Sequence, residues 1–158
     1  MARVEVELPS KVLFTTEIAI RIGDVNYGGH LGNDAVLALA HEARVRFLAT
    51  HGLGELDLDG VGLLMADAAV VYRAEGKYGM VLRVEVGAAD LRTRSCDLVY
   101  RFSDLATGTE IARVKTGLVF RDPATGKLVH VPDRLRRLVA AGVSPSASGP
   151  GPGRAQPG

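Results

Sequence analysis

Ile22-Gly-Asp-Val-Asn-Tyr-Gly-Gly-His-Leu-Gly-Asn33 forms the only dense polar cluster in the sequence. Before it, residues 12–22 alternate apolar and polar side chains, and this period of two predicts a strand with one buried face. After it, residues 36–48 are apolar on most faces of a helix, and His51-Gly52 closes that segment. We expect Asn33 to be the N-cap and the helix to be buried nearly all round. The sequence therefore predicts a fold organised around one long apolar helix.

Several segments further along the chain carry strand-like alternation or short apolar runs. They cover residues 61–72, 80–86, 96–102 and 112–120. Two near-identical turns, 104–108 and 122–126, begin with Asp and end with Gly, so each predicts a β-hairpin. A short strand at 127–131 and a closing helix at 134–141 complete the order. This order predicts an α+β fold in which an antiparallel sheet wraps around one central helix.

Length and composition favour a single domain, which we place at residues 1–142. The chain has 158 residues and 47% apolar composition, enough for an ordinary core, whereas the Pro-, Gly- and Ser-rich residues 143–158 predict a disordered tail. A net charge of +1 gives no field to hold nucleic acid or a membrane surface. The charged N-terminus lacks the pattern of a signal peptide, and no apolar run approaches the ~20 residues of a membrane span. We predict a cytoplasmic protein that binds neither nucleic acid nor membranes.

Asp24-Val-Asn26-Tyr-Gly-Gly29-His30-Leu-Gly-Asn33, followed by Glu42-Ala-Arg44 and Phe47-Leu48, resembles the signature of the hotdog-fold acyl-CoA thioesterases, specifically the 4-hydroxybenzoyl-CoA thioesterase-like family. The resemblance extends over roughly residues 12–141 and is more specific than any one short motif. It implies the hotdog fold, an acyl thioester as the ligand, and coenzyme A as part of the substrate rather than as a separate cofactor. A sheet of this type leaves an edge strand to be covered, so we expect a homodimer or a dimer of dimers, that is, a homotetramer.

One position departs from the family pattern. The family signature contains D-x-D, whose second Asp serves as the carboxylate base or nucleophile, and this position falls on Asn26. An amide cannot take a proton from water near neutral pH. Asp24-Val-Asn26 also looks like the D-V-N element of plant acyl-ACP thioesterases, in which an Asp, an Asn and a nearby His act together. In those proteins the His follows the Asn by two positions, whereas His30 follows Asn26 by four.

Thioester hydrolysis requires a polarised carbonyl, a positioned water and a proton acceptor. The glycine loop and the start of the helix could supply N–H donors to the developing oxyanion. The predicted catalytic residues are Asp24, Asn26, His30 and Glu42, and the predicted substrate-binding residues are Tyr27, Gly28 and Gly29. We favour Asp24 as the base, with Glu42 as its rival, and His30 is the nearby side chain of a type that titrates close to neutral pH.

These residues also have structural explanations. Asp24 and Asn26 are common turn residues that can bond the backbone of their own loop, and Glu42 could lie on a solvated helix face. We expect Tyr72 and Tyr100 to lie in the core. The four His residues and the single Cys show no metal-ligand spacing, so no metal is predicted. Basic side chains that could meet the phosphates of coenzyme A, or simply lie on a solvated strand face, are Arg73, Lys77, Arg92 and Arg94.

The predicted function is hydrolysis of an acyl-CoA or acyl-carrier thioester to a free acid and a thiol. A non-catalytic acyl-thioester-binding protein is the first alternative, because of Asn26. A lyase of the hotdog dehydratase type is the second, and it would need a His and a carboxylate facing each other across a dimer. The acyl group and the choice between coenzyme A and acyl carrier protein stay open.

Overall fold

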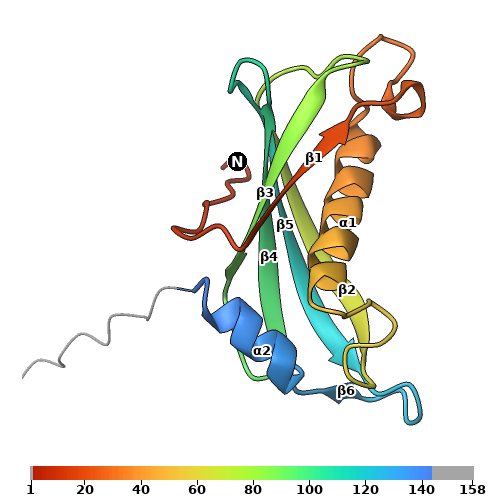
Figure 1. Cartoon of the computed structure of the whole chain (residues 1–158), viewed down its shortest axis with the longest axis vertical. Coiled ribbons are helices and arrows are strands. Elements are labelled where there is room, and N and C mark those ends of the chain that lie inside the picture. Colours follow the sequence, from red (N-terminus) through yellow and green to blue (C-terminus); the bar gives the residue numbers. More distant parts are fainter. Residues whose placement is uncertain (1, 144–158) are drawn as a thin grey trace, which may run out of the picture.

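The computed structural model describes residues 2–143, which fold as one antiparallel sheet with a long helix across one face (Figure 1). The strands are β1 (Phe14–Ala19), β2 (Gly62–Tyr72), β3 (Val81–Ala89), β4 (Ser95–Asp104), β5 (Glu110–Arg121) and β6 (Leu128–Val129). The helices are the 3-10 turn η1 (Ile22–Asp24), α1 (Asn33–Thr50) and α2 (Asp133–Ala140). The predicted disordered tail lies outside the described residues except for Val143.

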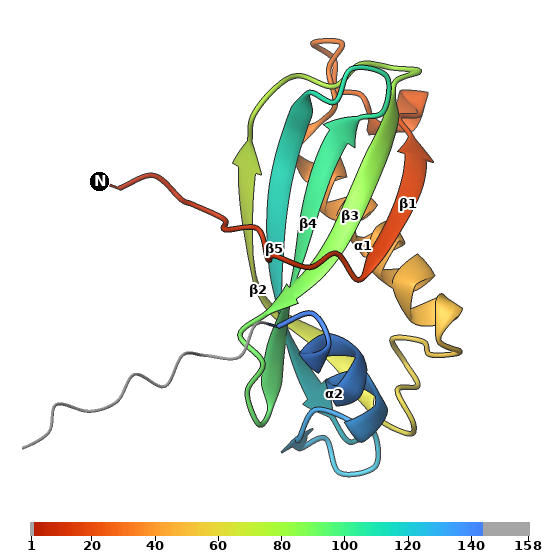
Figure 2. The ribbon, with the colours of Figure 1, turned by 60° about the vertical axis from the view of Figure 1, so that its left-hand side comes forward.

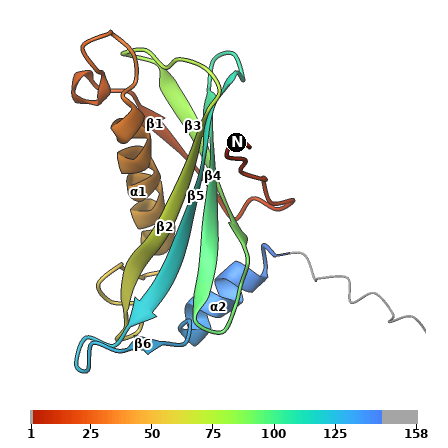
Figure 3. The same ribbon diagram turned by 180° about the vertical axis from the view of Figure 1, so that it is seen from behind.

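The strand order is β1-β3-β4-β5-β2, with β6 pairing beside the end of β5, and all neighbours are antiparallel. The chain therefore crosses from one edge, β1, to the other edge, β2, by way of α1. This crossing lays α1 diagonally over the sheet, as Figure 1 and the view from behind in Figure 3 show. An antiparallel sheet around one long helix is the arrangement that the sequence predicted.

The core lies between α1 and the sheet. Alternate residues of the strands point at the helix, and they meet the apolar face of α1 with almost no exposed surface. The largest of these buried side chains are Phe47, Leu48, Leu82, Val84, Leu98, Tyr100, Phe102, Leu118 and Phe120. Full burial of each Leu, Val or Phe contributes about 1.5–3 kcal/mol, so this layer is the main source of the fold's stability.

Two expectations about the helix were wrong. The N-cap is Gly32 and α1 already begins at Asn33, so no side chain caps the helix. The helix is also not buried all round, because Ala38, Val45 and Ala49 are exposed on the side turned away from the sheet. Apolar side chains on that outer side explain why the sequence pattern suggested burial on every face.

Both predicted hairpins are confirmed, and their turns are built in the same way. In the β4–β5 turn, the Gly108 N–H donates to the Asp104 carbonyl (2.7 Å) and the Ala106 N–H donates to Asp104 Oδ1 (3.1 Å). The β5–β6 turn repeats both bonds with Asp122 as the acceptor, at 2.8 Å each. Gly108 and Gly126 close the two turns with φ of 75° and 72°, a conformation that glycine adopts without strain.

The other face of the sheet is covered by the N-terminal segment and α2, as Figure 2 shows. The segment passes so close to β3 that a side chain at Gly87 would collide with Pro9. Leu135 and Val139 anchor α2 as buried residues. Neither α1 nor α2, the two α-helices of the described residues, is long and apolar enough to cross a membrane.

Candidate active site

A cavity of about 400 Å³ opens where α1 begins, between the glycine loop and the segment that follows β2. Residues from both sides line it, namely Asn26, His30, Leu31, Asn33, Val36, Tyr72, Arg73, Ala74, Glu75, Gly76 and Ile111. This is the place where the polar cluster of the sequence meets a part of the chain far from it in sequence.

The two sides of the cavity are fixed to each other by hydrogen bonds to main-chain carbonyls. The Leu31 N–H donates to the Gly76 carbonyl (2.9 Å), and the Tyr72 hydroxyl donates to the Asn33 carbonyl (2.9 Å). A Cβ on Gly76 would come within 2.8 Å of Ile20 Cδ1 and 3.0 Å of Leu31 Cβ, so only glycine allows this approach. Tyr72, which we expected in the core, is exposed and holds the end of β2 against the start of the helix.

His30 contacts a carboxylate across the cavity. Its Nε2 lies 3.0 Å from Glu75 Oε2. A carboxylate on one ring nitrogen orients the imidazole and favours the tautomer in which that nitrogen carries the proton. The other nitrogen, Nδ1, is then the basic one. Sequence reasoning missed Glu75 because it lies in an irregular loop whose position depends on the close approach at Gly76.

Asn26 organises the glycine loop. Its Oδ1 accepts hydrogen bonds from the Gly28 N–H (3.0 Å) and the His30 N–H (3.3 Å). Its carbonyl accepts from the Gly29 N–H (3.0 Å), and its own N–H donates to the His30 carbonyl (2.8 Å). The side-chain oxygen is thus used by the turn, while the Nδ2 donors are left for a ligand in the cavity. The N–H groups of the loop that we expected at the oxyanion are occupied within the loop.

Asp24 is buried and does not line the cavity. Its Oδ2 accepts from the Arg21 N–H (2.8 Å) and pairs with Arg21 Nε at 3.4 Å, so the carboxylate closes the turn that leads out of β1. Its carbonyl accepts from the Gly32 N–H (2.9 Å). These contacts are those of a turn residue.

The remaining predicted site residues also lie outside the cavity. Glu42 Oε1 accepts from Arg46 Nε (2.8 Å), and Arg46 donates onward to Thr16 Oγ1 (3.0 Å), so Glu42 is turned towards β1. Tyr27 is fully exposed, and Gly28 and Gly29 shape the loop without lining the cavity. Of the seven predicted residues, the structure brings only Asn26 and His30 to the cavity.

A second cavity, of about 440 Å³, lies between the middle of α1 and β2. Its polar wall is a chain of charged groups, in which Glu55 accepts from Arg44 Nε (2.5 Å) and pairs with His41 Nε2 (2.9 Å). Burial raises the pKa of Glu55, but the hydrogen bond from Arg44 and the charges beside it outweigh burial, and the net pKa is lowered. Arg44 is almost completely buried. Arg44 lies among apolar residues of the helix, and a charged side chain buried there needs a partner of opposite charge. This pattern could have predicted an acidic partner such as Glu55 from the sequence.

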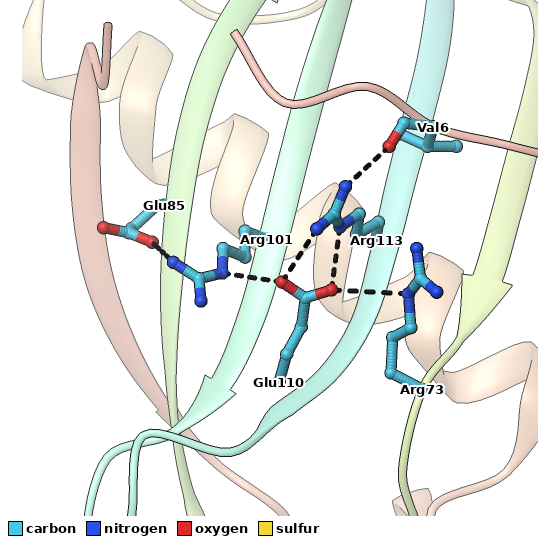
Figure 4. Close-up of polar contacts among 6 residues, drawn as sticks. All are labelled: Val6, Arg73, Glu85, Arg101, Glu110 and Arg113. Atoms are coloured by element: carbon cyan, nitrogen blue, oxygen red, sulfur yellow. Dashed lines mark hydrogen bonds and ion pairs between the residues drawn. The ribbon is translucent and has the colours of Figure 1, made fainter. Parts of the chain in front are cut away.

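A further polar network lies on the opposite face of the sheet (Figure 4). Glu110 Oε1 accepts from Arg113 Nε (2.7 Å), and Oε2 accepts from Arg101 Nε (2.8 Å). Arg113 also donates to the Val6 carbonyl (3.1 Å) and so ties the N-terminal segment to the sheet. Burial raises the pKa of Glu110, but these guanidinium groups outweigh burial and lower it, so the carboxylate is ionised.

This architecture is similar to that of known thioesterases. A sequence model of the thioesterase-like superfamily matches residues 20–139. No curated protein matches the chain by sequence. A 1,4-dihydroxy-2-naphthoyl-CoA thioesterase from Synechocystis is similar in structure, with a TM-score of 0.74 and 19% identity over 80% of this chain and 95% of that chain.

Two more solved structures share the fold. A putative thioesterase from Pseudomonas aeruginosa matches with a TM-score of 0.73 and 26% identity, over 80% of this chain and 98% of that chain. A Staphylococcus aureus protein solved in complex with CoA matches with a TM-score of 0.74 and 15% identity, over 87% of each chain. The α+β hotdog architecture predicted from the sequence is thereby confirmed.

Proposed function

Since this chain belongs to the thioesterase-like superfamily, we propose that it hydrolyses an acyl thioester to a free acid and a thiol. The observation that supports this proposal best is the His30–Glu75 pair in a cavity at the start of a helix. The imidazole of His30 can accept a proton from water, which the amide of Asn26 cannot. It replaces Asp24, our preferred base from the sequence, whose carboxylate is held by Arg21.

The reaction can be followed atom by atom. His30 Nδ1 takes a proton from water as the water oxygen bonds to the thioester carbon, and Glu75 stabilises the imidazolium that forms. The carbonyl oxygen becomes an oxyanion, for which the uncapped N-terminus of α1 and the Nδ2 donors of Asn26 are available. The C–S bond then breaks, and the imidazolium returns its proton to the thiolate. The products are a carboxylic acid and a thiol.

The test is thiol release from acyl-CoA thioesters with short, long and aromatic acyl groups, using the wild type beside Asn26→Asp. We expect the wild type to turn over at least one class, because His30 supplies the base. Aspartate at position 26 can accept the same two N–H bonds as the Asn26 oxygen, so the variant is expected to fold normally. Turnover by Asn26→Asp with none by the wild type would instead identify a thioester-binding protein without a hydrolytic step. Hydration of an enoyl thioester without thiol release would identify a lyase.

We also propose that the working unit is a homodimer, or a dimer of dimers, joined through β2. Within residues 2–143 this edge strand pairs only with β5, and Leu64 and Met65, which point to its two opposite faces, are both exposed. An edge strand that exposes apolar side chains is typical of a strand that pairs with another copy, and the one charged residue of β2, Asp67, is already paired with Lys115 of β5. The cytoplasmic location stays a prediction from the sequence.

The dimer is tested by light scattering on Met65→Arg. We expect the wild type to have the mass of at least two chains and the variant to be monomeric, because the substitution would replace an exposed apolar side chain of the joined edge by a positive charge. Leu128→Arg is the matched control, since Leu128 in β6 and Met65 are both 51% exposed. A wild-type monomer, or equal dissociation by both substitutions, would rule out pairing through β2.

A further inference from the structure

We propose that Glu110 is a positioning residue, which holds the segment that carries Glu75 in place through Arg73. Glu110 does not line the active-site cavity, because it lies on the opposite face of the sheet. The inference rests on the proposed function, since it concerns the carboxylate that stabilises the imidazolium of His30. It gives a function to the charged network of Figure 4.

The side chain of Glu75 is held by few contacts of its own. It is 68% exposed, and within residues 2–143 the contact with His30 is its one polar contact. The position of its carboxylate therefore depends on the main chain of residues 73–76, which leaves the sheet where β2 ends. The rate of a catalysed reaction is sensitive to small misplacements of the groups that take part in it, so any contact that fixes this main chain supports catalysis.

The main chain of this segment is bonded at two points. At the end nearer β2, the N–H groups of Arg73 and Ala74 both donate to the Ile111 carbonyl, at 2.8 and 3.2 Å. At the other end, the Gly76 carbonyl accepts from the Leu31 N–H (2.9 Å). Two points define a line about which the residues between them can still turn. A third contact away from that line restrains the turning.

Glu110 supplies the third contact. Arg73 Nε lies 3.4 Å from Glu110 Oε1, and the Glu110 side chain is only 17% exposed. The carboxylate is itself fixed, because Arg113 Nε donates to Oε1 (2.7 Å) and Arg101 Nε donates to Oε2 (2.8 Å). Arg113 also donates to the Val6 carbonyl of the N-terminal segment, as Figure 4 shows. Charge-assisted hydrogen bonds from two strands thus make Glu110 a rigid anchor, to which the side chain of Arg73 ties the segment.

The experiment measures thiol release from acyl thioesters of N-acetylcysteamine, a small thiol without phosphate or nucleotide, so that contacts with a carrier do not contribute. Arg73→Met leaves Glu110 with its two other arginines. We expect its kcat to fall about fivefold, which corresponds to ~1 kcal/mol, with KM unchanged. Arg73→Lys should recover part of the loss, because it keeps the charge. In a Glu75→Gln background, Arg73→Met should have no further effect on kcat, since no carboxylate is left to position.

Glu110→Gln is the second variant, and Glu85→Gln is its matched control. Glu85 belongs to the same network, where it pairs with Arg101 at 3.7 Å, so its substitution removes the same charge from the same face. We expect Glu110→Gln to lower kcat at least as much as Arg73→Met, and Glu85→Gln to leave kcat unchanged. Equal losses in the two glutamate variants would overturn the proposal, because the total charge of the network would then matter rather than the anchor.

A crystal structure of Arg73→Met gives a readout that does not require activity. We expect the distance between His30 Nε2 and Glu75 Oε2, which is 3.0 Å in the wild type, to lengthen beyond about 3.5 Å, where no hydrogen bond remains. An unchanged distance would overturn the proposal. A rise in KM with kcat unchanged would also overturn it, because Arg73 would then meet the substrate instead. If the wild type releases no thiol from any thioester, the proposed function fails, and the distance alone decides this inference.

Discussion

Replacing His30 by Gln is expected to lower kcat for thioester hydrolysis by about 10²–10⁴-fold, the usual contribution of a positioned general base. KM should change little, because an amide of similar size keeps the shape of the cavity. The side chain is partly exposed and its backbone bonds to Asn26 do not depend on the ring, so the variant should fold normally. Steady-state thiol release measures kcat and KM, and a thermal melt of the same preparation tests whether the variant is folded.

Glu42→Gln is the control for this prediction. Glu42 was the rival base from the sequence, but it pairs with Arg46 on the side of α1 that faces β1. We expect its substitution to leave kcat within a factor of two or so of the wild type, since loss of an exposed i,i+4 pair is worth about 0.3–0.5 kcal/mol in stability and touches no reacting group. Full activity in His30→Gln together with loss of activity in Glu42→Gln would identify Glu42, on the helix, as the base.

Replacing Arg44 by Ala is expected to give the largest loss of stability, about 3–5 kcal/mol in the free energy of unfolding. The side chains of Arg44 and Glu55 are only 7% and 22% exposed, so the substitution leaves the half-buried carboxylate with His41 as its remaining partner and opens a gap beneath the helix. Urea unfolding measures the loss. Arg46→Ala is the matched control on the same helix. It removes a pair with Glu42 that is 39% and 50% exposed and two hydrogen bonds, to Thr16 Oγ1 and the Glu17 carbonyl, so it should cost about 1–2 kcal/mol.

The same pair predicts how stability depends on pH. The folded-state pKa of Glu55 lies below its ordinary value of 4.5, so folding favours the ionised form. Its contribution is complete above that value and is lost as the pH falls through the lowered folded-state pKa. Between pH 6 and pH 3, the wild type should therefore lose more stability than Glu55→Gln. Equal losses in these two proteins, or equal losses in Arg44→Ala and Arg46→Ala, would show that the buried pair does not matter to the fold.

The parts of this fold that could be predicted from the sequence are those with a local cause. The two hairpins follow from Asp104 and Asp122, which bond the backbone of their own turns, and the strands follow from the alternation of side chains facing α1. The sequence predicted the position of the long helix in the chain, but not that one side of this helix is exposed. Ala38 and Val45 have the same apolar character as buried residues although no part of the described chain covers them.

The site was only half predictable, because its two halves come from distant segments. Asn26 and His30 stood out in a glycine-rich stretch, whereas Glu75 lies in a loop that has no pattern of its own. For Asp24 the sequence leaves two roles open, because a carboxylate before a glycine loop suits a base and a turn equally well. In the structure its carboxylate accepts from the Arg21 N–H and lies outside the cavity, which the sequence does not show.

The turn around Asn26 also bears on how chemistry at this position can change between related proteins. The side-chain oxygen that accepts the two N–H groups of the turn is present in both an amide and a carboxylate, so the turn can have the same conformation with either residue. Codons for asparagine and aspartate differ by a single base. A lineage can therefore exchange a binding group for a nucleophile in one mutational step, without passing through a poorly folded ancestor.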